Sequence, residues 1–201
     1  MRKLRALSLA AVIVTAFAVA ATSLAATGTI KLKPTAGRFG DAPDYKALGN
    51  GTAAEASWTN KAAASGKFSV LLEKSVPTAE PAYAATLVDG VAGLTVADLG
   101  TIGFSVKGTC SGGSPRFNLR YDVDGDGNAD GIAFYGCANH IVGTNGDWTR
   151  MEVADATVSD LGPVPATATV TQLSVLVDEQ GTYWVDDVTA AGQTVGEPNG
   201  G

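Results

Sequence analysis

Five oxygen-bearing side chains occupy every second position in the stretch YDVDGDGNADG, residues 121–131. They are Asp122, Asp124, Asp126, Asn128 and Asp130, and glycines lie among them. Only 17% of the chain is charged, so four carboxylates in nine positions are unusual. Carboxylates on a glycine-rich backbone can converge on Ca²⁺, which takes six to eight oxygen ligands. Without a cation, each carboxylate pair about 5 Å apart costs roughly 0.8 kcal/mol in water. The stretch therefore predicts a calcium loop, and the alternative is a solvated Asp/Gly hairpin turn.

The spacing of these residues matches the first part of an EF-hand loop and then departs from it. The twelfth position is Ala133, where an EF-hand has glutamate, and the flanking segments are typical of strands. The pattern D-x-D-G-D-G-x-x-D resembles instead the calcium loops of integrin-alpha (FG-GAP) repeats and is similar to thrombospondin type 3 loops. Those families carry several copies and this chain carries one, which excludes a propeller or a calcium array. The resemblance implies structural Ca²⁺ bound by the side chains of Asp122, Asp124, Asp126 and Asp130 and by the backbone carbonyl of Asn128.

Residues 1–26 have the composition of a secretory signal peptide. Arg2, Lys3 and Arg5 form a positive start, an apolar run follows, and Ser23 and Ala25 offer a small-residue cleavage site. The apolar run is short for a bilayer span, which needs about 20 residues, although an uncleaved anchor is the alternative. We therefore expect a secreted protein, extracellular or in the cell envelope, with no membrane span after cleavage.

The charge of the chain argues against one class of partner, and its two cysteines predict a covalent link. Removal of the leader takes three of the 14 basic residues and leaves 11 against 20 acidic ones, a net charge of −9. Because no basic patch remains to neutralise phosphates, nucleic-acid binding is disfavoured. The two cysteines, Cys110 and Cys137, predict a disulfide in an exported protein, with two buried free thiols as the alternative. Such a bond would contribute about 3 kcal/mol.

The remaining sequence consists of short runs of β-branched and aromatic residues separated by Gly, Pro, Asn and Asp. One run places Phe117, Leu119 and Tyr121 on one side of a strand, and the opposite side carries Arg116, Asn118 and Arg120. About nine or ten such runs predict an all-β, jelly-roll-like antiparallel β-sandwich, with a closed barrel as the alternative. We expect this domain over residues 27–190, with one helical turn within residues 94–101, and a flexible tail over residues 191–201.

Catalytic patterns are weak. The single histidine, His140, lies in the polar stretch GCANHIVGTNGD, which we expect to be a loop. A serine of CSGGS could complete a triad with it, but no G-x-S-x-G elbow is present. Loose carboxylate pairs occur in MEVAD and YWVDDV, without the E-x-D-x-x-E strand pattern of sandwich-type glucanases. We therefore predict a protein that is not an enzyme, and a secreted hydrolase with an unrecognised site is an alternative.

The order of three segments resembles jelly-roll carbohydrate-binding modules. They are SWTNKAAASGKFSVLLEK, GDWTRMEV and QLSVLVDEQGTYWVDDV. The resemblance implies non-catalytic glycan binding, with sugar rings stacked on exposed aromatic residues. The alternatives are a purely structural or adhesion-type surface protein and, for each aromatic residue, a place in the core. The aromatic candidates are Trp58, Tyr83, Tyr135, Trp148, Tyr183 and Trp184, and the predicted ligand site comprises Arg116, Arg120, Tyr135 and Trp148.

Overall fold

The computed structural model describes residues 28–39, 46–47 and 53–198, so the expected signal peptide lies outside the described residues. Almost all of the regular structure is β-strand, with two short 3₁₀ turns, η1 (Ala97–Leu99) and η2 (Cys137–Asn139). The turn expected within residues 94–101 is confirmed by η1. The strands in chain order are β1 (Lys31–Arg38), β2 (Lys46–Ala47), β3 (Ala54–Thr59), β4 (Ser69–Lys74), β5 (Ala82–Asp89), β6 (Ile102–Lys107), β7 (Arg116–Asp122), β8 (Gly131–Gly136), β9 (Ile141–Asn145), β10 (Trp148–Val153), β11 (Val158–Ser159), β12 (Gly162–Pro163), β13 (Thr169–Val177), β14 (Gly181–Ala190) and β15 (Gln193–Val195).

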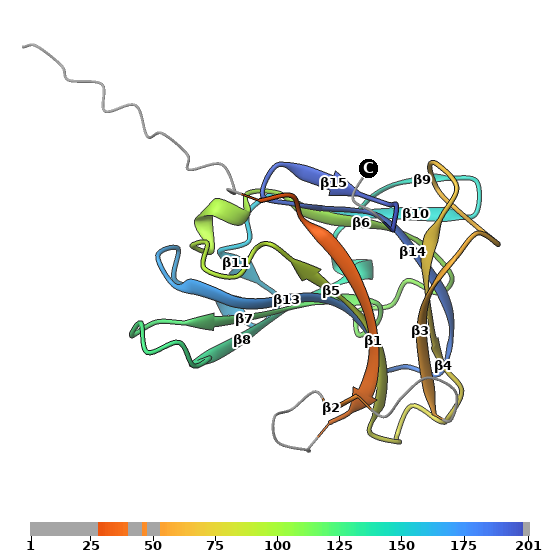
Figure 1. Cartoon of the computed structure of the whole chain (residues 1–201), viewed down its shortest axis with the longest axis horizontal. Helices are drawn as coiled ribbons and strands as arrows, with labels where there is room; N and C mark the ends of the chain where they lie inside the picture. The colour runs from red at the N-terminus through yellow and green to blue at the C-terminus, as the bar shows by residue number, and fades with distance from the viewer. Residues whose placement is uncertain (1–27, 40–45, 48–52, 199–201) are drawn as a thin grey trace, which may run out of the picture.

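Two antiparallel sheets face each other (Figure 1). Sheet 1 has the order β2-β1-β5-β13-β7-β8, and sheet 2 has the order β3-β4-β14-β6-β10-β9 with β15 paired to β14. In the described part of the chain the two sheets share no strand, so the predicted all-β sandwich is confirmed and the barrel is not formed. The hairpin of β7 and β8 lies at the opposite end of the molecule from β3 and β4 (Figure 1).

Alternation along the strands decides which side chains fill the space between the sheets. Phe104 of β6 and Phe117 of β7 are fully buried, and their rings meet edge to face across the sandwich at 5.2 Å between centroids. Leu119 is buried beside them, as its place on the same side of β7 as Phe117 predicts. The intervening residues of each strand point to the opposite side, which we call the outer face of each sheet.

Five strands occur where the sequence predicts none, and two of them, β11 and β12, form a separate two-residue pairing. β9 occupies part of the expected polar loop around His140 and pairs with β10 as the edge of sheet 2. All five of its residues are exposed, so it lacks the alternation that marks a half-buried strand. β15 lies inside the expected tail, because Val195 pairs with Val188 and is buried against the core. β2 is a two-residue pairing with β1.

The disulfide predicted between Cys110 and Cys137 is present. It joins the segment before β7 to the start of η2, directly after β8. Cys137 is fully buried in the core cluster, so the bond anchors both ends of the β7–β8 hairpin to the sandwich. Neither helical turn of the described residues has the length or hydropathy of a segment that crosses a bilayer.

Candidate functional site

The acidic loop between β7 and β8 is shaped by its own carboxylates. The buried carboxylate of Asp122 accepts the N–H groups of Gly125 and Gly127, at 2.7 and 2.8 Å. Both glycines have positive φ, 83° and 86°, which residues with a Cβ rarely adopt. The N–H donor of Gly125, followed by that of Gly127, holds the pKa of Asp122 below its ordinary value. Asp122 is therefore a fixed, ionised anchor of the loop.

Three of the five predicted calcium ligands come together. Single carboxylate oxygens of Asp122, Asp124 and Asp130 all lie within 4.8 Å of one another. Asp126 is engaged elsewhere, since its two oxygens accept the backbone N–H and the side-chain amide of Asn128 at 2.7 and 3.0 Å. The three converging carboxylates are the oxygen donors that Ca²⁺ prefers.

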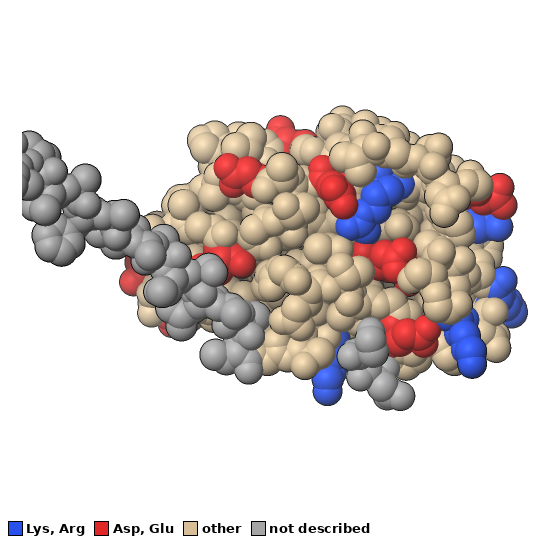
Figure 2. All heavy atoms as spheres, turned by 90° about the horizontal axis from the view of Figure 1, so that it is seen from above, with Lys and Arg blue, Asp and Glu red and all other residues tan. Residues whose placement is uncertain are grey.

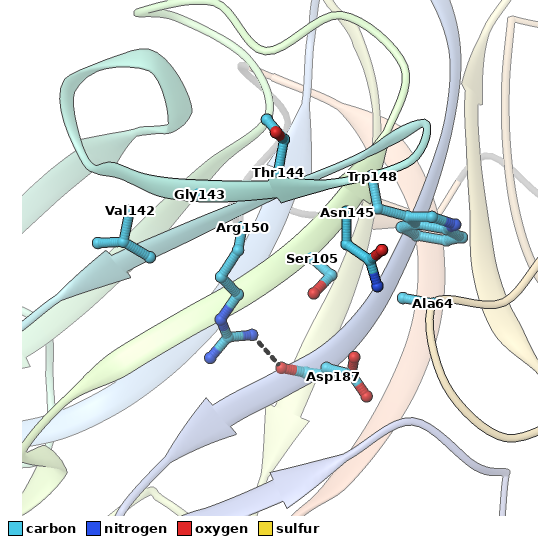
Figure 3. A pocket seen from close by; sticks show the side chains of 9 residues that line it. All are labelled: Ala64, Ser105, Val142, Gly143, Thr144, Asn145, Trp148, Arg150 and Asp187. Carbon is cyan, nitrogen blue, oxygen red and sulfur yellow. Dashed lines mark hydrogen bonds between the residues drawn. The ribbon is translucent and has the colours of Figure 1, made fainter.

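A second candidate site is an open pocket on the outer face of sheet 2, over β6, β10 and β14 (Figure 3). Its volume is about 260 Å³. In Figure 3 the indole of Trp148 and the side chain of Val142 lie at opposite ends of the pocket lining, with the guanidinium of Arg150 between them. The polar side chains that line it are those of Ser105, Thr144, Asn145, Arg150 and Asp187.

The β9–β10 hairpin supplies one wall of the pocket. Gly146, with φ of 59°, makes the turn, and Asn145 pairs with Trp148 directly before and after it. Directly paired residues in antiparallel strands stand on the same face of the sheet, so the amide and the indole are neighbours above the pocket. Trp148 is only partly exposed, whereas Asn145 is exposed. An aromatic surface and a hydrogen-bonding amide therefore occupy the same end of the site.

A β-bulge in β14 supplies the floor. The register between β14 and β6 shifts between Asp186 and Thr189, and Asp187 takes the left-handed conformation with φ of 49°. The Asp186 carboxylate is fully buried and accepts three backbone N–H groups, from Ala64 at 2.7 Å, Ser65 at 3.0 Å and Asp187 at 2.7 Å. Burial raises the pKa of Asp186. This carboxylate holds the loop between β3 and β4 against the pocket.

Arg150 crosses the pocket with each of its nitrogen atoms engaged. Nη1 donates to the carbonyl oxygen of Asp187 at 2.6 Å, Nη2 to the hydroxyl of Thr189 at 3.0 Å, and Nε to Glu152 at 3.1 Å. The face over these strands shows acidic and basic side chains intermixed rather than a patch of one sign (Figure 2). The guanidinium therefore organises the pocket and is not left as an uncompensated positive charge.

The four predicted ligand residues fall in three places. Trp148 alone lines the pocket. Arg116 and Arg120 lie on the outer face of sheet 1, where Arg116 makes a two-pronged ion pair with Asp178, each bond 2.7 Å, and lies over the ring of Phe134. Tyr135 is fully buried and its hydroxyl donates to the carbonyl of Ala156. Its ring therefore offers no face to a sugar, because on β8 it points between the sheets.

His140 and the serines of CSGGS do not form a triad. Nε2 of His140 lies 2.9 Å from a carboxylate oxygen of Asp160. The hydroxyl oxygen of Ser111 lies 2.9 Å from both the backbone carbonyl oxygen of Ser114 and a carboxylate oxygen of Glu179, so its one hydrogen is directed to these acceptors, and the hydroxyl of Ser114 accepts the N–H of Asp178. Among the predicted carboxylate pairs, Asp186 accepts a backbone N–H from Ala64 in the loop between β3 and β4, and Glu152 pairs with Arg150.

Sequence reasoning missed most of the pocket. The sequence does not mark Asn145, Arg150, Ser105 and Asp187 as ligand residues, because they come from segments that meet only through the pairing of β9, β10, β6 and β14. One signal was available for Arg150, which alternates with the buried residues Met151 and Val153 and must therefore point outward.

The sequence matches no protein-family model and no curated protein. Among solved structures, the chain is similar to a family 30 carbohydrate-binding module, with a TM-score of 0.51, 15% identity, and coverage of 83% of this chain and 86% of that one. It is also similar to the family 30 carbohydrate-binding module of a cellulosomal cellulase of Clostridium thermocellum, with a TM-score of 0.51, 16% identity, and coverage of 80% and 93%. At these identities the likeness shows the fold, a β-sandwich of the carbohydrate-binding-module type.

Proposed function

We propose that the protein is a secreted, non-catalytic module that binds a glycan in the pocket beside Trp148. The observation that carries this proposal is a partly exposed indole placed next to amide, hydroxyl and carboxylate groups in an open pocket. The apolar face of a sugar ring stacks on aromatic surface, while its hydroxyl groups need hydrogen-bonding partners. The likeness to family 30 modules supports the same class of ligand.

Four of the lining residues would contribute to glycan binding in different ways. The indole of Trp148 provides the stacking surface, and the exposed amide of Asn145 can both donate to and accept from sugar hydroxyl groups. The Asp187 carboxylate is held by the hydroxyl of Ser65, which donates to it at 2.5 Å, and retains acceptor capacity toward the pocket. Arg150 keeps the bulge of β14 in place through the carbonyl of Asp187.

The same proposal assigns Ca²⁺ to the acidic loop, with a structural role. The side chains of Asp122, Asp124 and Asp130 would bind it, because their oxygens already converge. The cation would offset the repulsion among these carboxylates and stabilise the β7–β8 hairpin. No loop residue is among the described residues that line the pocket, so calcium acts on stability and not on contact with the glycan.

Calorimetric titration of soluble neutral glycans into the mature protein and its Trp148→Ala variant tests the glycan site. We expect the variant to bind about tenfold more weakly or worse, since it loses the apolar surface that a sugar ring would bury, at about 25 cal/mol per Å², and about 1.4 kcal/mol is a tenfold change in Kd. The matched control is Leu161→Ala, which truncates an apolar side chain that is 66% exposed on the β11–β12 turn. Equal binding by Trp148→Ala and the unmodified protein would contradict the proposed site.

A further inference from the structure

A second tryptophan stands on the same outer face, in line with the pocket. Trp148 of β10 pairs with Lys107 of β6, and on the other side of β6 Lys107 pairs with Trp184 of β14. Directly paired residues share a face, so the three side chains stand side by side on the outer face of sheet 2. We call Trp148, Lys107 and Trp184 the tryptophan row.

Neither tryptophan belongs to the buried core cluster, although Nε1 of Trp184 is covered by protein. Both are partly exposed, while the neighbours of Trp184 in the chain, Tyr183 and Val185, are buried between the sheets. The row also continues beyond the tryptophans. Leu71 of β4 pairs with Trp184 and is partly exposed, and Asn145 of β9 pairs with Trp148 at the other end. A continuous path of side chains therefore crosses five strands of sheet 2.

Strand geometry sets the spacing of this path. Adjacent strands lie about 4.8 Å apart, so the two tryptophans, two strands apart, are separated by about 10 Å. Rings of an extended pyranose chain follow one another at nearly the spacing of adjacent strands. A chain that crosses the strands at right angles would therefore place one ring on each tryptophan and one ring between them, over the methylene stem of Lys107.

The row carries no uncompensated charge. The ammonium group of Lys107 lies 2.9 Å from the carboxylate of Asp147, and Arg150 in the next row is satisfied by Asp187, Thr189 and Glu152. A polyanionic chain would meet no free cation here and would be repelled by the acidic net charge of the protein. An uncharged ligand matches the row.

We propose that Trp184 is a second stacking platform, and that the ligand is an extended, uncharged polysaccharide chain lying across β10, β6 and β14. This inference rests on the proposed function. It adds that the ligand is an extended chain of sugars and that Trp184 is the residue that binds the additional rings. A glycan recognised only through its end sugar would use the pocket at Trp148 and leave Trp184 untouched.

The test is calorimetric titration of β-1,4-linked glucose oligosaccharides, from disaccharide to hexasaccharide, into the unmodified protein, with a xylose series and a uronic acid series in parallel. We expect affinity to rise with chain length and Trp184→Ala to remove that rise, weakening the longest ligand about tenfold while leaving the disaccharide unaffected. Trp184→Phe should restore part of the loss, because it retains an aromatic face. Leu161→Ala is the matched control.

Because truncation of Trp184 could destabilise sheet 2, the length series on the unmodified protein is an independent readout. Trp148-dependent binding that stays constant from disaccharide to hexasaccharide, with no effect of Trp184→Ala, overturns the second platform and leaves the proposed function standing. Preference for a uronic acid oligosaccharide over the neutral series overturns the uncharged ligand. If neither neutral nor acidic chains bind, the proposed function fails and this inference fails with it.

Discussion

The acidic loop and the bulge of β14 both use aspartate to bind backbone N–H groups in a tight turn, but their surroundings are opposite. At the bulge, Asp186 is fully buried and its two oxygens accept three N–H groups. In the loop, Asp124 and Asp130 are exposed, and their oxygens lie within 4.8 Å of an oxygen of Asp122.

The difference lies in where the N–H donors come from. Two of the donors to Asp186 lie 122 and 121 residues away, in the loop between β3 and β4, so this carboxylate is satisfied by the fold. The donors to Asp122 come from three and five residues along the same loop, and the neighbouring carboxylates are brought together without a countercharge. The carboxylate at the bulge is satisfied without a ligand, whereas we expect the loop to be stabilised when a cation binds its carboxylates.

The largest effect on stability is expected from removing the buried carboxylate of Asp186. Asp186→Ala leaves backbone N–H groups of Ala64 and Ser65 without their acceptor, and we expect the free energy of unfolding to fall by about 3 kcal/mol. Urea unfolding measures the loss. Asp187→Ala is the matched control, because that carboxylate accepts from the Ser65 hydroxyl at the surface and should cost less. Equal losses in the two variants would show that the buried acceptor is not what holds the loop.

Calcium should produce the next largest effect, confined to the acidic loop. At a free Ca²⁺ concentration 100 times the dissociation constant, we expect about 2.7 kcal/mol of added stability relative to EDTA. Asp124→Ala combined with Asp130→Ala should remove this gain, because it deletes two of the three converging carboxylates. Thermal unfolding in EDTA and in millimolar Ca²⁺ measures it, and identical melting temperatures in the unmodified protein would eliminate the calcium site.

The raised pKa of Asp186 predicts a pH dependence of opposite sign to that of the surface aspartates. A carboxyl group with a raised pKa in the folded state holds its proton after the unfolded chain has lost it, near pH 4, so stability falls as pH rises through that window. The lowered pKa values of Asp147 and Asp160 act the other way, since the stability they contribute is lost as pH falls below about 4.

Urea unfolding of the unmodified protein and of Asp186→Asn across this range isolates the buried group. The surface contributions are common to both proteins and cancel in the difference. The stability of the unmodified protein relative to Asp186→Asn should therefore decrease as pH rises above about 4. A difference that is flat or increases with pH would mean that the folded state does not raise the pKa of Asp186.

The smallest expected effect distinguishes the five calcium ligands predicted from the sequence from the cluster of three carboxylates found in the structure. Asp126 bonds to Asn128 and lies outside the cluster of three, so Asp126→Ala should retain the shift in melting temperature on adding Ca²⁺. The single variant Asp124→Ala, measured beside it, should lose most of that shift. Loss of the shift in Asp126→Ala as well would restore the five-ligand arrangement that the spacing predicts.

The sequence by itself determined the features whose causes are local. Alternation in residues 116–121 placed Phe117 and Leu119 in the core, and enough such runs predicted the sandwich. The even cysteine count predicted the disulfide. On β8, however, Ile132 and Phe134 are as apolar as Ala133 and Tyr135, so alternation could not show that Tyr135 is the buried one.

Only the tertiary structure decided the candidate ligand face. Trp148, Lys107 and Trp184 are up to 77 residues apart in the chain, and only the register of β10, β6 and β14 makes them neighbours. The loop at Ala64 reaches the pocket because a buried carboxylate 122 residues away binds it. Local patterns carry information about which side of a strand is buried. Which strands stand next to one another depends on pairing between distant segments, and that pairing created the pocket.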